Sequence, residues 1–344
     1  MQLANGIFFH AVGASSASLC YVPQKKVKGW SWQSYWLAQA AVCWLIMPIF
    51  IAWLTIPSLG TVITNAPSSA IWQSFFLGML YGIGGTAFGM AIKHVGISLT
   101  YAIAVGISCI LGTMVPPIIN GTFSSLLQTN GIGYIFSGVA MGALGIAICG
   151  LAGRKKELNL TATAKMNFSL AKGLPLCLLA GILSAFYGFS LNAGTPIADV
   201  AEQYGAGDYK QNVIYVFSNT GAFLSTLIYC TYLHIKEKTF TEYFQSSADR
   251  KLALNFLMSA ITGVLWYGQF FFYGLGHVRL GEYQFSSWAI HMIMLVLFSS
   301  IAGLLLKEWK SCSKGTLRVL MLALGVLIAA VLILTYGNYL GGLN

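Results

Sequence analysis

Residues 131–151 read GIGYIFSGVAMGALGIAICGL, a run of 21 residues that contains no charged side chain. A helix rises 1.5 Å per residue, so a run of this length covers about 30 Å, the thickness of the hydrocarbon core of a bilayer. The stretch therefore predicts a helix that crosses a membrane.

Similar apolar runs recur along the whole chain. Hydrophobic residues make up 57% of the sequence and charged residues only 8%, against roughly 25% charged in soluble domains. Because lipid cannot satisfy exposed backbone groups, each run must be helical. We predict an all-α membrane protein without a separate soluble domain and with ten transmembrane helices, at about 3–22, 33–56, 69–91, 98–118, 131–151, 173–192, 212–233, 253–275, 285–306 and 317–339.

The basic residues predict the orientation of these helices. Seventeen of the 19 lysines and arginines lie in the connections that follow the odd-numbered runs, and only Lys210 and Arg279 lie in the others. By the positive-inside rule the odd-numbered connections are cytoplasmic, so both termini face the periplasm. The formal charge of +10 is thus a topology signal and no sign of nucleic-acid binding. The first run lacks a basic n-region and a cleavage site, so we expect it to remain in the mature protein.

The longest polar connection divides the chain into halves. We expect residues 1–152 to form a first five-helix repeat, 153–172 a cytoplasmic linker and 173–344 a second five-helix repeat. An odd number of helices per half makes the second repeat enter the membrane inverted, as in many secondary transporters. Short similarities between the halves, such as Gly13–Ala17 and Gly181–Ala185, favour this division.

Titratable residues are nearly excluded from the apolar runs. Every Asp and Glu lies outside them, and deep inside them only His10 and His291 can titrate. Intramembrane ionisable groups are usually functional, and histidine changes charge near physiological pH. The two histidines are therefore candidates for proton coupling to the transport of an uncharged solute. The alternative is that they are hydrogen-bonded packing residues, in which case Glu282 or Glu308 is the next candidate.

Aromatic and amide side chains share helix faces near these histidines. Aromatic rings cover the apolar faces of a sugar, while amide, phenol and imidazole groups bond its hydroxyls. Trp288 and Tyr273 could instead be interfacial anchors, and Gln269 could bridge two helices. The candidate substrate-binding residues are Tyr81, Trp266, Gln269, Tyr273, Trp288, His10 and His291.

Cysteine and glycine spacing predicts packing. The seven cysteines form no C-x-x-C pair and are expected to be buried small hydrophobes, with no metal site and no cofactor. Gly78, Gly82 and Gly85 or Gly89 line one helical face, a spacing that lets membrane helices pack closely.

Several motifs lie in register with a known family. They include Gly6–His10, Lys25–Trp32, Tyr81–Gly84, Pro117–Gly121, Trp266–Tyr273, Gly276-His277, Ser287-Trp288, His291-Met292 and Lys307–Trp309. On these the chain resembles the bacterial L-rhamnose–proton symporter family of the drug/metabolite transporter superfamily. The resemblance implies an inner-membrane permease that imports L-rhamnose, or an analogue such as L-lyxose, with a proton. It also implies a pocket role for His10, Gln269, Tyr273, Trp288 and His291. Gly84–Thr86 and Ala206–Asn212 depart from the family pattern.

Other functions fit the sequence less well. An efflux permease for a small amphipathic metabolite is the nearest alternative, and the direction of accumulation separates it from import. A membrane enzyme would need a nucleophile with its base, or a metal cluster, and no carboxylate accompanies either deep histidine. A sensor would usually carry a soluble output domain. Beyond the sugar, protons and the lipid bilayer, the sequence indicates no obligate protein partner.

Overall fold

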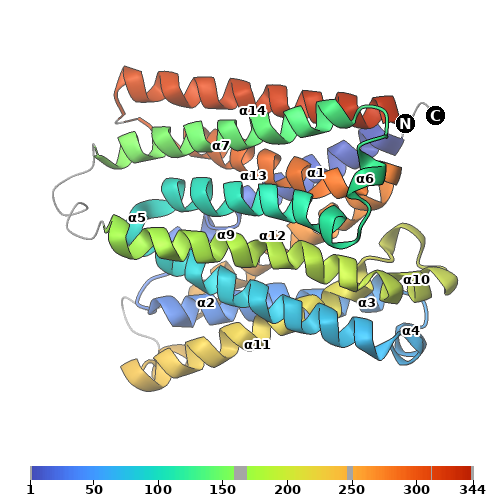
Figure 1. Ribbon diagram of the computed structural model, residues 1–344. Helices are drawn as coiled ribbons and strands as arrows, with labels where there is room; N and C mark the ends of the chain where they lie inside the picture. The colour runs from blue at the N-terminus through green and yellow to red at the C-terminus, as the bar shows by residue number, and fades with distance from the viewer. Residues whose placement is uncertain (1, 159–168, 246–250, 311, 342–344) are drawn as a thin grey trace. The chain divides into compact units, whose positions relative to one another are not determined.

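A computed structural model describes residues 2–158, 169–245, 251–310 and 312–341 (Figure 1). Within these ranges the chain forms helices and no strand. The elements are α1 (Gln2–Leu19), η1 (Pro23–Lys26), α2 (Trp32–Ala40), η2 (Ala41–Ile46), α3 (Met47–Thr55), α4 (Leu59–Asn65), α5 (Ser68–Ile119), α6 (Phe123–Leu126), α7 (Ile132–Leu158), α9 (Leu170–Ala193), α10 (Thr195–Gln203), η3 (Gly207–Tyr209), α11 (Asn212–Glu237), η4 (Phe240–Tyr243), α12 (Leu252–His277), η5 (Val278–Ser286), α13 (Ser287–Leu305) and α14 (Lys314–Gly341).

The prediction of an all-α protein with ten membrane helices is confirmed. Over the described ranges, ten helical segments are long and apolar enough to cross a membrane, and one of them, Ile132–Lys156, contains nearly all of the run 131–151. One connection differs from expectation. The sequence predicted a loop between the third and fourth spans, but the backbone stays helical throughout α5, which contains both Ser68–Ile92 and Leu99–Ile119.

The chain divides into two compact units. Unit 1 contains Met1–Ser18, Gly84–Gly188 and Leu275–Asn344, and unit 2 contains Leu19–Ile83 and Phe189–Gly274. Each unit takes segments from both predicted halves of the sequence. The inverted relationship of those halves stays a prediction.

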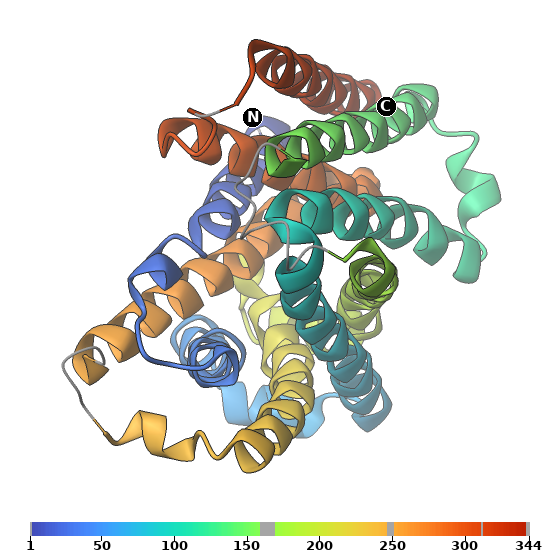
Figure 2. The same cartoon turned by 90° about the vertical axis from the view of Figure 1, so that its left-hand side faces the viewer.

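In unit 1, α7 and α14 lie side by side in both views (Figures 1 and 2). Gly138 and Gly145 are two turns apart on α7, where an added Cβ atom would lie 2.6 Å from Leu334 Cγ and 2.7 Å from Leu327 Cδ2 of α14. The two leucines, also two turns apart, thus fill the spaces that the glycines leave. Packing of this kind holds membrane helices together where no hydrophobic effect acts between them.

In unit 2, α11 approaches α5 closely at the glycine face that the sequence predicted. A Cβ atom on Gly78 would lie 2.7 Å from Ser218 C, and one on Gly82 would lie 2.7 Å from Ala222 Cα. Neither position has room for a larger residue, because the obstructing atoms belong to the backbone. The close-packing prediction is confirmed for Gly78 and Gly82.

A carboxylate from a distant segment caps the start of α2. Glu242 Oε2 accepts hydrogen bonds from Ser31 N at 2.7 Å, Ser31 Oγ at 2.9 Å and Ser34 Oγ at 2.5 Å. A negative charge at a helix N-terminus is stabilised by the unpaired N–H groups there and by the helix dipole. Trp30 Nε1 donates to Glu242 O at 2.9 Å, so residues 30–34 are fixed to η4.

A second hydrogen-bond chain in the same unit sets the tautomer of His234. Gln33 Nε2 donates to Thr239 Oγ1 at 3.0 Å, and Tyr243 Oη donates to Ser34 O at 3.0 Å. Burial raises the pKa of the Tyr243 phenol, so its proton stays in place. His234 lies between them, with Nε2 3.1 Å from Tyr243 Oη and Nδ1 2.7 Å from Thr239 Oγ1. Tyr243 must therefore accept from Nε2–H, and the bond between Nδ1 and Thr239 Oγ1 runs from the hydroxyl when the ring is neutral.

We predict that Glu242→Ala destabilises the folded protein by about 1–3 kcal/mol, because it leaves the donors of Ser31 and Ser34 without their acceptor. Thermal unfolding of the purified protein in detergent measures the change. Glu202→Ala is the control, since Glu202 belongs to an exposed pair with Lys210, and such a pair contributes about 0–1 kcal/mol. Equal unfolding temperatures for the two variants would contradict the capping role.

Candidate functional site

The structure places the predicted site residues in two groups, one in each unit. In unit 1, His10 on α1 is fully buried and His291 on α13 is 2% exposed. Their ring centroids lie 5.9 Å apart with the planes at 65°. Ser287, one turn before His291, places its Oγ 2.8 Å from His10 Nε2. The i, i+4 spacing puts Ser287 and His291 on one face of α13, toward His10.

A close backbone approach holds His10 in this position. A Cβ atom on Gly276 would lie 2.9 Å from His10 Nε2 and from Gly6 O, so only glycine lets the end of α12 lie against α1 here. The next residue, His277, interacts electrostatically with His10, as does His291. Like charges at close range disfavour one another, so a proton on one of these imidazoles disfavours a proton on another. The sequence did not single out Ser287 or His277 as candidate site residues. Both belong to motifs that carry the family resemblance, Ser287-Trp288 and Gly276-His277.

Trp288 is fixed inside unit 1. Its indole Nε1 donates to Ser108 O at 3.0 Å and lies 3.3 Å from Ser108 Oγ, and Ser108 Oγ in turn donates to Ser184 Oγ at 3.1 Å. The indole also packs on Gly112 and lies 6.2 Å from the Tyr187 ring. The N–H group of an interfacial anchor points to the headgroups, whereas this one is bonded within the helix bundle.

The second group surrounds Trp266 in unit 2. Its ring lies 5.1 Å from Trp44, 5.5 Å from Trp36 and 5.7 Å from Tyr21, all at tilted or edge-on angles. Trp266 also shares a hydrogen bond with Tyr81, in which the indole N–H must be the donor. Edge-on contacts of this kind stabilise an aromatic cluster beyond its buried area.

The aromatic cluster continues along α12. Phe270, one turn beyond Trp266, lies 6.4 Å from Tyr81 and 6.1 Å from Tyr215. Gln269 and Tyr273 are buried on the same helix, and Tyr273 interacts with Tyr215. The sequence had named Tyr81, Trp266, Gln269 and Tyr273 as candidates, and the structure brings them into or beside this cluster. Sequence reasoning missed the partners that α2, η2 and α11 supply, because an aromatic residue in an apolar run is not distinguished by spacing from one that faces lipid.

Of the two carboxylates named as further candidates for proton coupling, the structure describes the side chain of one. Glu308 lies 3.6 Å from Lys156 Nζ, which also lies 4.6 Å from the centre of the Trp309 ring. This carboxylate therefore belongs to an ion pair in the basic connections. The Glu282 side chain lies outside the described part of the structure. No group of three or more metal-ligating side chains occurs among the residues that the structure describes.

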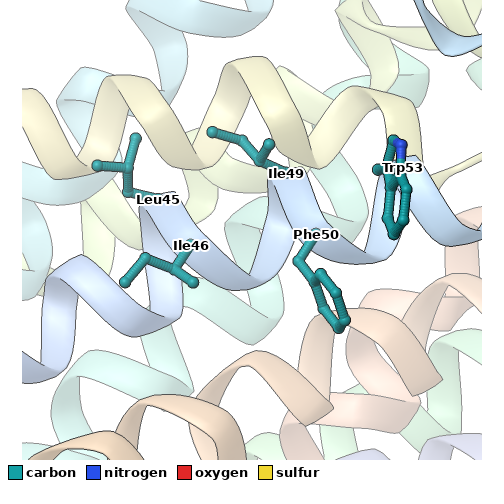
Figure 3. Close-up of a pocket in the computed structure, with 5 residues that line it drawn as sticks. All are labelled: Leu45, Ile46, Ile49, Phe50 and Trp53. Atoms are coloured by element: carbon teal, nitrogen blue, oxygen red, sulfur yellow. The ribbon is translucent and has the colours of Figure 1, made fainter.

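One surface groove lies on α3 and the end of η2 (Figure 3). Leu45, Ile46, Ile49, Phe50 and Trp53 line about 360 Å³, and Trp53 is 67% exposed. A surface made of aliphatic and aromatic side chains suits contact with lipid. The groove is therefore separate in character from the two buried groups.

The helices and the two buried groups of side chains define the class of protein. Over the described ranges, ten helical segments of membrane-spanning length, with buried titratable, amide and aromatic side chains, make this a multi-pass membrane protein.

The chain belongs to the L-rhamnose-proton symport protein (RhaT) family, which matches residues 1–339. Similar relatives are the L-rhamnose-proton symporters of Enterobacter sp. (strain 638), 36% identical, of Citrobacter koseri, 37% identical, and of Shigella dysenteriae serotype 1, 36% identical. Each match spans 335 residues, 96% of this chain and 97% of the relative. The prediction of a transporter of this family rather than an enzyme is confirmed.

We predict that Gly112→Ala destabilises unit 1, because the added methyl group would collide with the Trp288 indole. Overpacking of this kind costs about 1–3 kcal/mol. Gly106→Ala is the matched control on the same helix, since its methyl group would lie at an ordinary 3.5 Å from Ile146 Cγ2. Thermal unfolding in detergent compares the two variants. If Gly112→Ala unfolds at the temperature of the control, the indole is not held against α5.

Proposed function

We propose that this protein imports L-rhamnose together with a proton, with L-lyxose and related neutral sugars as the other substrates to test. Membership of the L-rhamnose-proton symport protein family supports the reaction. Within the structure, the observation that carries the proposal is the buried group of His10, Ser287 and His291. It is a titratable group at a depth where ionisable residues are usually functional.

We assign the proton to the histidine group of unit 1. One proton held by His10, His277 or His291 raises the cost of a second, so the group suits the transport of a single proton per cycle. Ser287 is the hydrogen-bond partner that orients His10. In its proton-loaded form the group would favour sugar binding and the change to the inward-facing state, and the higher cytoplasmic pH would then release the proton.

The driving force is sufficient for accumulation. One proton moving inward down a potential of ~100 mV releases roughly 2.3 kcal/mol. At ~1.4 kcal/mol per tenfold, this supports a sugar gradient on the order of fiftyfold.

We assign sugar contacts to the aromatic cluster of unit 2, and Trp288 of unit 1 stays a separate candidate. Trp266, Tyr81 and Tyr273 offer ring faces and hydroxyl groups, and Gln269 offers an amide. Such groups recognise C–H faces and hydroxyls without a charge. A substrate with a net charge would need a buried counter-charge.

The distribution of basic residues supports an orientation in the inner membrane. Seventeen of the 19 lysines and arginines lie in the odd-numbered connections, which we place in the cytoplasm by the positive-inside rule. Both termini then lie in the periplasm. Import in this orientation loads the sugar and the proton from the periplasmic side.

We predict that cells or vesicles containing the protein take up L-rhamnose with a matching alkalinisation of the medium, because each sugar carries a proton inward. A protonophore should reduce accumulation to the external concentration while leaving counterflow exchange. Radiolabelled sugar and an external pH electrode measure both fluxes. Uptake that a protonophore leaves unchanged would contradict the coupling. Net loss of a preloaded metabolite would favour the efflux alternative.

We predict that Ser287→Ala moves the pH midpoint of L-rhamnose uptake by about 0.4–1 pH unit, because it removes one net hydrogen bond of about 0.5–1.5 kcal/mol from His10. If Ser287 accepts from His10, its loss weakens the protonated form and lowers the midpoint. If Ser287 donates, its loss raises the midpoint.

Ser286→Ala is the matched control for this measurement. Ser286 is a buried neighbour whose hydroxyl donates to Asn338 Oδ1 at 3.1 Å, so its removal should leave the midpoint in place. The same midpoint in both variants and in the wild type would show that His10 is not the coupling group.

A further inference from the structure

The face that α2 and η2 turn toward α12 has an irregular backbone. Residues Ala41–Ile46 form a π-helix, in which Met47 N donates to Val42 O five residues earlier. Pro48 follows at the start of α3. Proline has no N–H and its ring crowds the carbonyl four residues before it, and the wider π turn accommodates both effects. Single π turns occur frequently at functional sites.

A glycine brings α12 against this irregular segment. A Cβ atom on Gly263 would lie 2.6 Å from Val42 Cβ and 2.8 Å from Gln39 O. One turn further along α12 come Trp266 and Tyr267, and the Trp266 ring lies against Trp36 and Trp44. Gln39 therefore lies on α2 between the two tryptophans in sequence, at the point where α2 and α12 meet.

Several polar groups of unit 2 have no hydrogen-bond partner among the described residues. Gln39 is fully buried, and neither its Nε2 nor its Oε1 atom finds a partner. The same holds for four further groups, Trp36 Nε1 and Trp44 Nε1 on α2 and η2, Tyr215 Oη on α11 and Tyr267 Oη on α12. The two tyrosine rings lie 6.4 Å apart, and both contact Phe270. Buried polar groups in proteins are nearly always paired. Four of these five side chains belong to the aromatic cluster and Gln39 lies on α2 between two of them in sequence, so we take the five as groups that a ligand would pair.

The chemistry of these groups defines the ligand. An amide offers a donor and an acceptor side by side, which matches two adjacent hydroxyls. The indole N–H groups donate, and the phenols both donate and accept. The group contains amides, indoles and phenols without a carboxylate or an ammonium, so the matching solute is neutral and hydroxylated on several carbons.

We propose that Gln39 is a specificity-determining residue of the sugar site, which bonds a pair of adjacent hydroxyls while Trp36, Trp44, Tyr215 and Tyr267 bond the others. This inference rests on the proposed function, which supplies a neutral sugar as the solute. It adds α2, η2 and α11 to the predicted candidates that lie in unit 2, on α5 and α12. Bound water is the competing partner for the same atoms, because a buried water makes about three hydrogen bonds.

The test measures sugar binding and stability in the same variants. Full-length protein is purified in detergent, and the rise of its unfolding temperature with L-rhamnose gives the dissociation constant. Gln39→Met keeps the length of the side chain, and Gln39→Leu shortens it. Both should weaken L-rhamnose binding by about tenfold, the equivalent of two neutral hydrogen bonds. Without sugar they should unfold at or above the wild-type temperature, because an unpaired amide has been removed.

Thr226→Val is the matched control. Thr226 on α11 is another fully buried residue of unit 2 whose hydroxyl has no partner among the described residues, and it lies outside the set of residues proposed to bond the sugar. The affinity of the Thr226→Val variant for L-rhamnose should equal that of the wild type.

Deoxy analogues of L-rhamnose identify which hydroxyls Gln39 bonds. The wild type should lose affinity for the analogue that lacks a hydroxyl bonded by Gln39, whereas Gln39→Met should not distinguish that analogue from L-rhamnose.

Three results would overturn the inference. L-rhamnose affinity within twofold of wild type in both Gln39 variants would exclude a contact with the sugar. A lower unfolding temperature at unchanged affinity would show that the amide binds water. If the wild type responds to no neutral sugar at all, the proposed function fails together with the inference, and this outcome is seen before any variant is made.

Discussion

The hydrocarbon layer of a membrane offers no hydrogen-bond partners, so each polar group of the protein that lies in it must find a partner within the protein. The rest of the structure depends on this constraint. Backbone groups bond one another by forming helices, which is why the described chain contains no strand. Each polar side chain needs its own partner. The indole N–H of Trp288 is bonded to Ser108, and His10 is bonded to Ser287. At the start of α2, where the helix leaves backbone donors unpaired, Glu242 supplies the acceptor from η4.

The same constraint gives meaning to the polar groups that lack a partner. Close packing through Gly78, Gly82, Gly138 and Gly145 brings neighbouring helices together, and an interior packed in this way holds few voids. In such an interior, an unpaired amide such as that of Gln39 is costly. Proteins retain costly features where function needs them. A transport site must release its solute, so its polar groups bond that solute only while the site is loaded.

Particular residues show which features of the fold and of the candidate site could be predicted from the sequence. The run 131–151 was found as Ile132–Lys156, because the cost of placing a charge in lipid is a property of each residue by itself. His10 and His291 were singled out because they lie deep inside apolar runs, and the structure places their rings 5.9 Å apart in unit 1. The helical connection within α5 was predicted as a loop, since Lys93 and His94 interrupt the apolar pattern although they do not interrupt the helix.

Length and composition by themselves determined the helical class, the number of membrane-length helices and the kinds of side chain available for proton and sugar chemistry. Those properties follow from transfer free energies that add up residue by residue along the chain. Only the tertiary structure decided which polar groups find partners. Ser287 meets His10 across 277 positions of sequence, and Gln39 lies where the π turn and Gly263 bring α2 against α12. Hydrogen bonding depends on distances of about 3 Å between atoms, and a single sequence does not contain those distances.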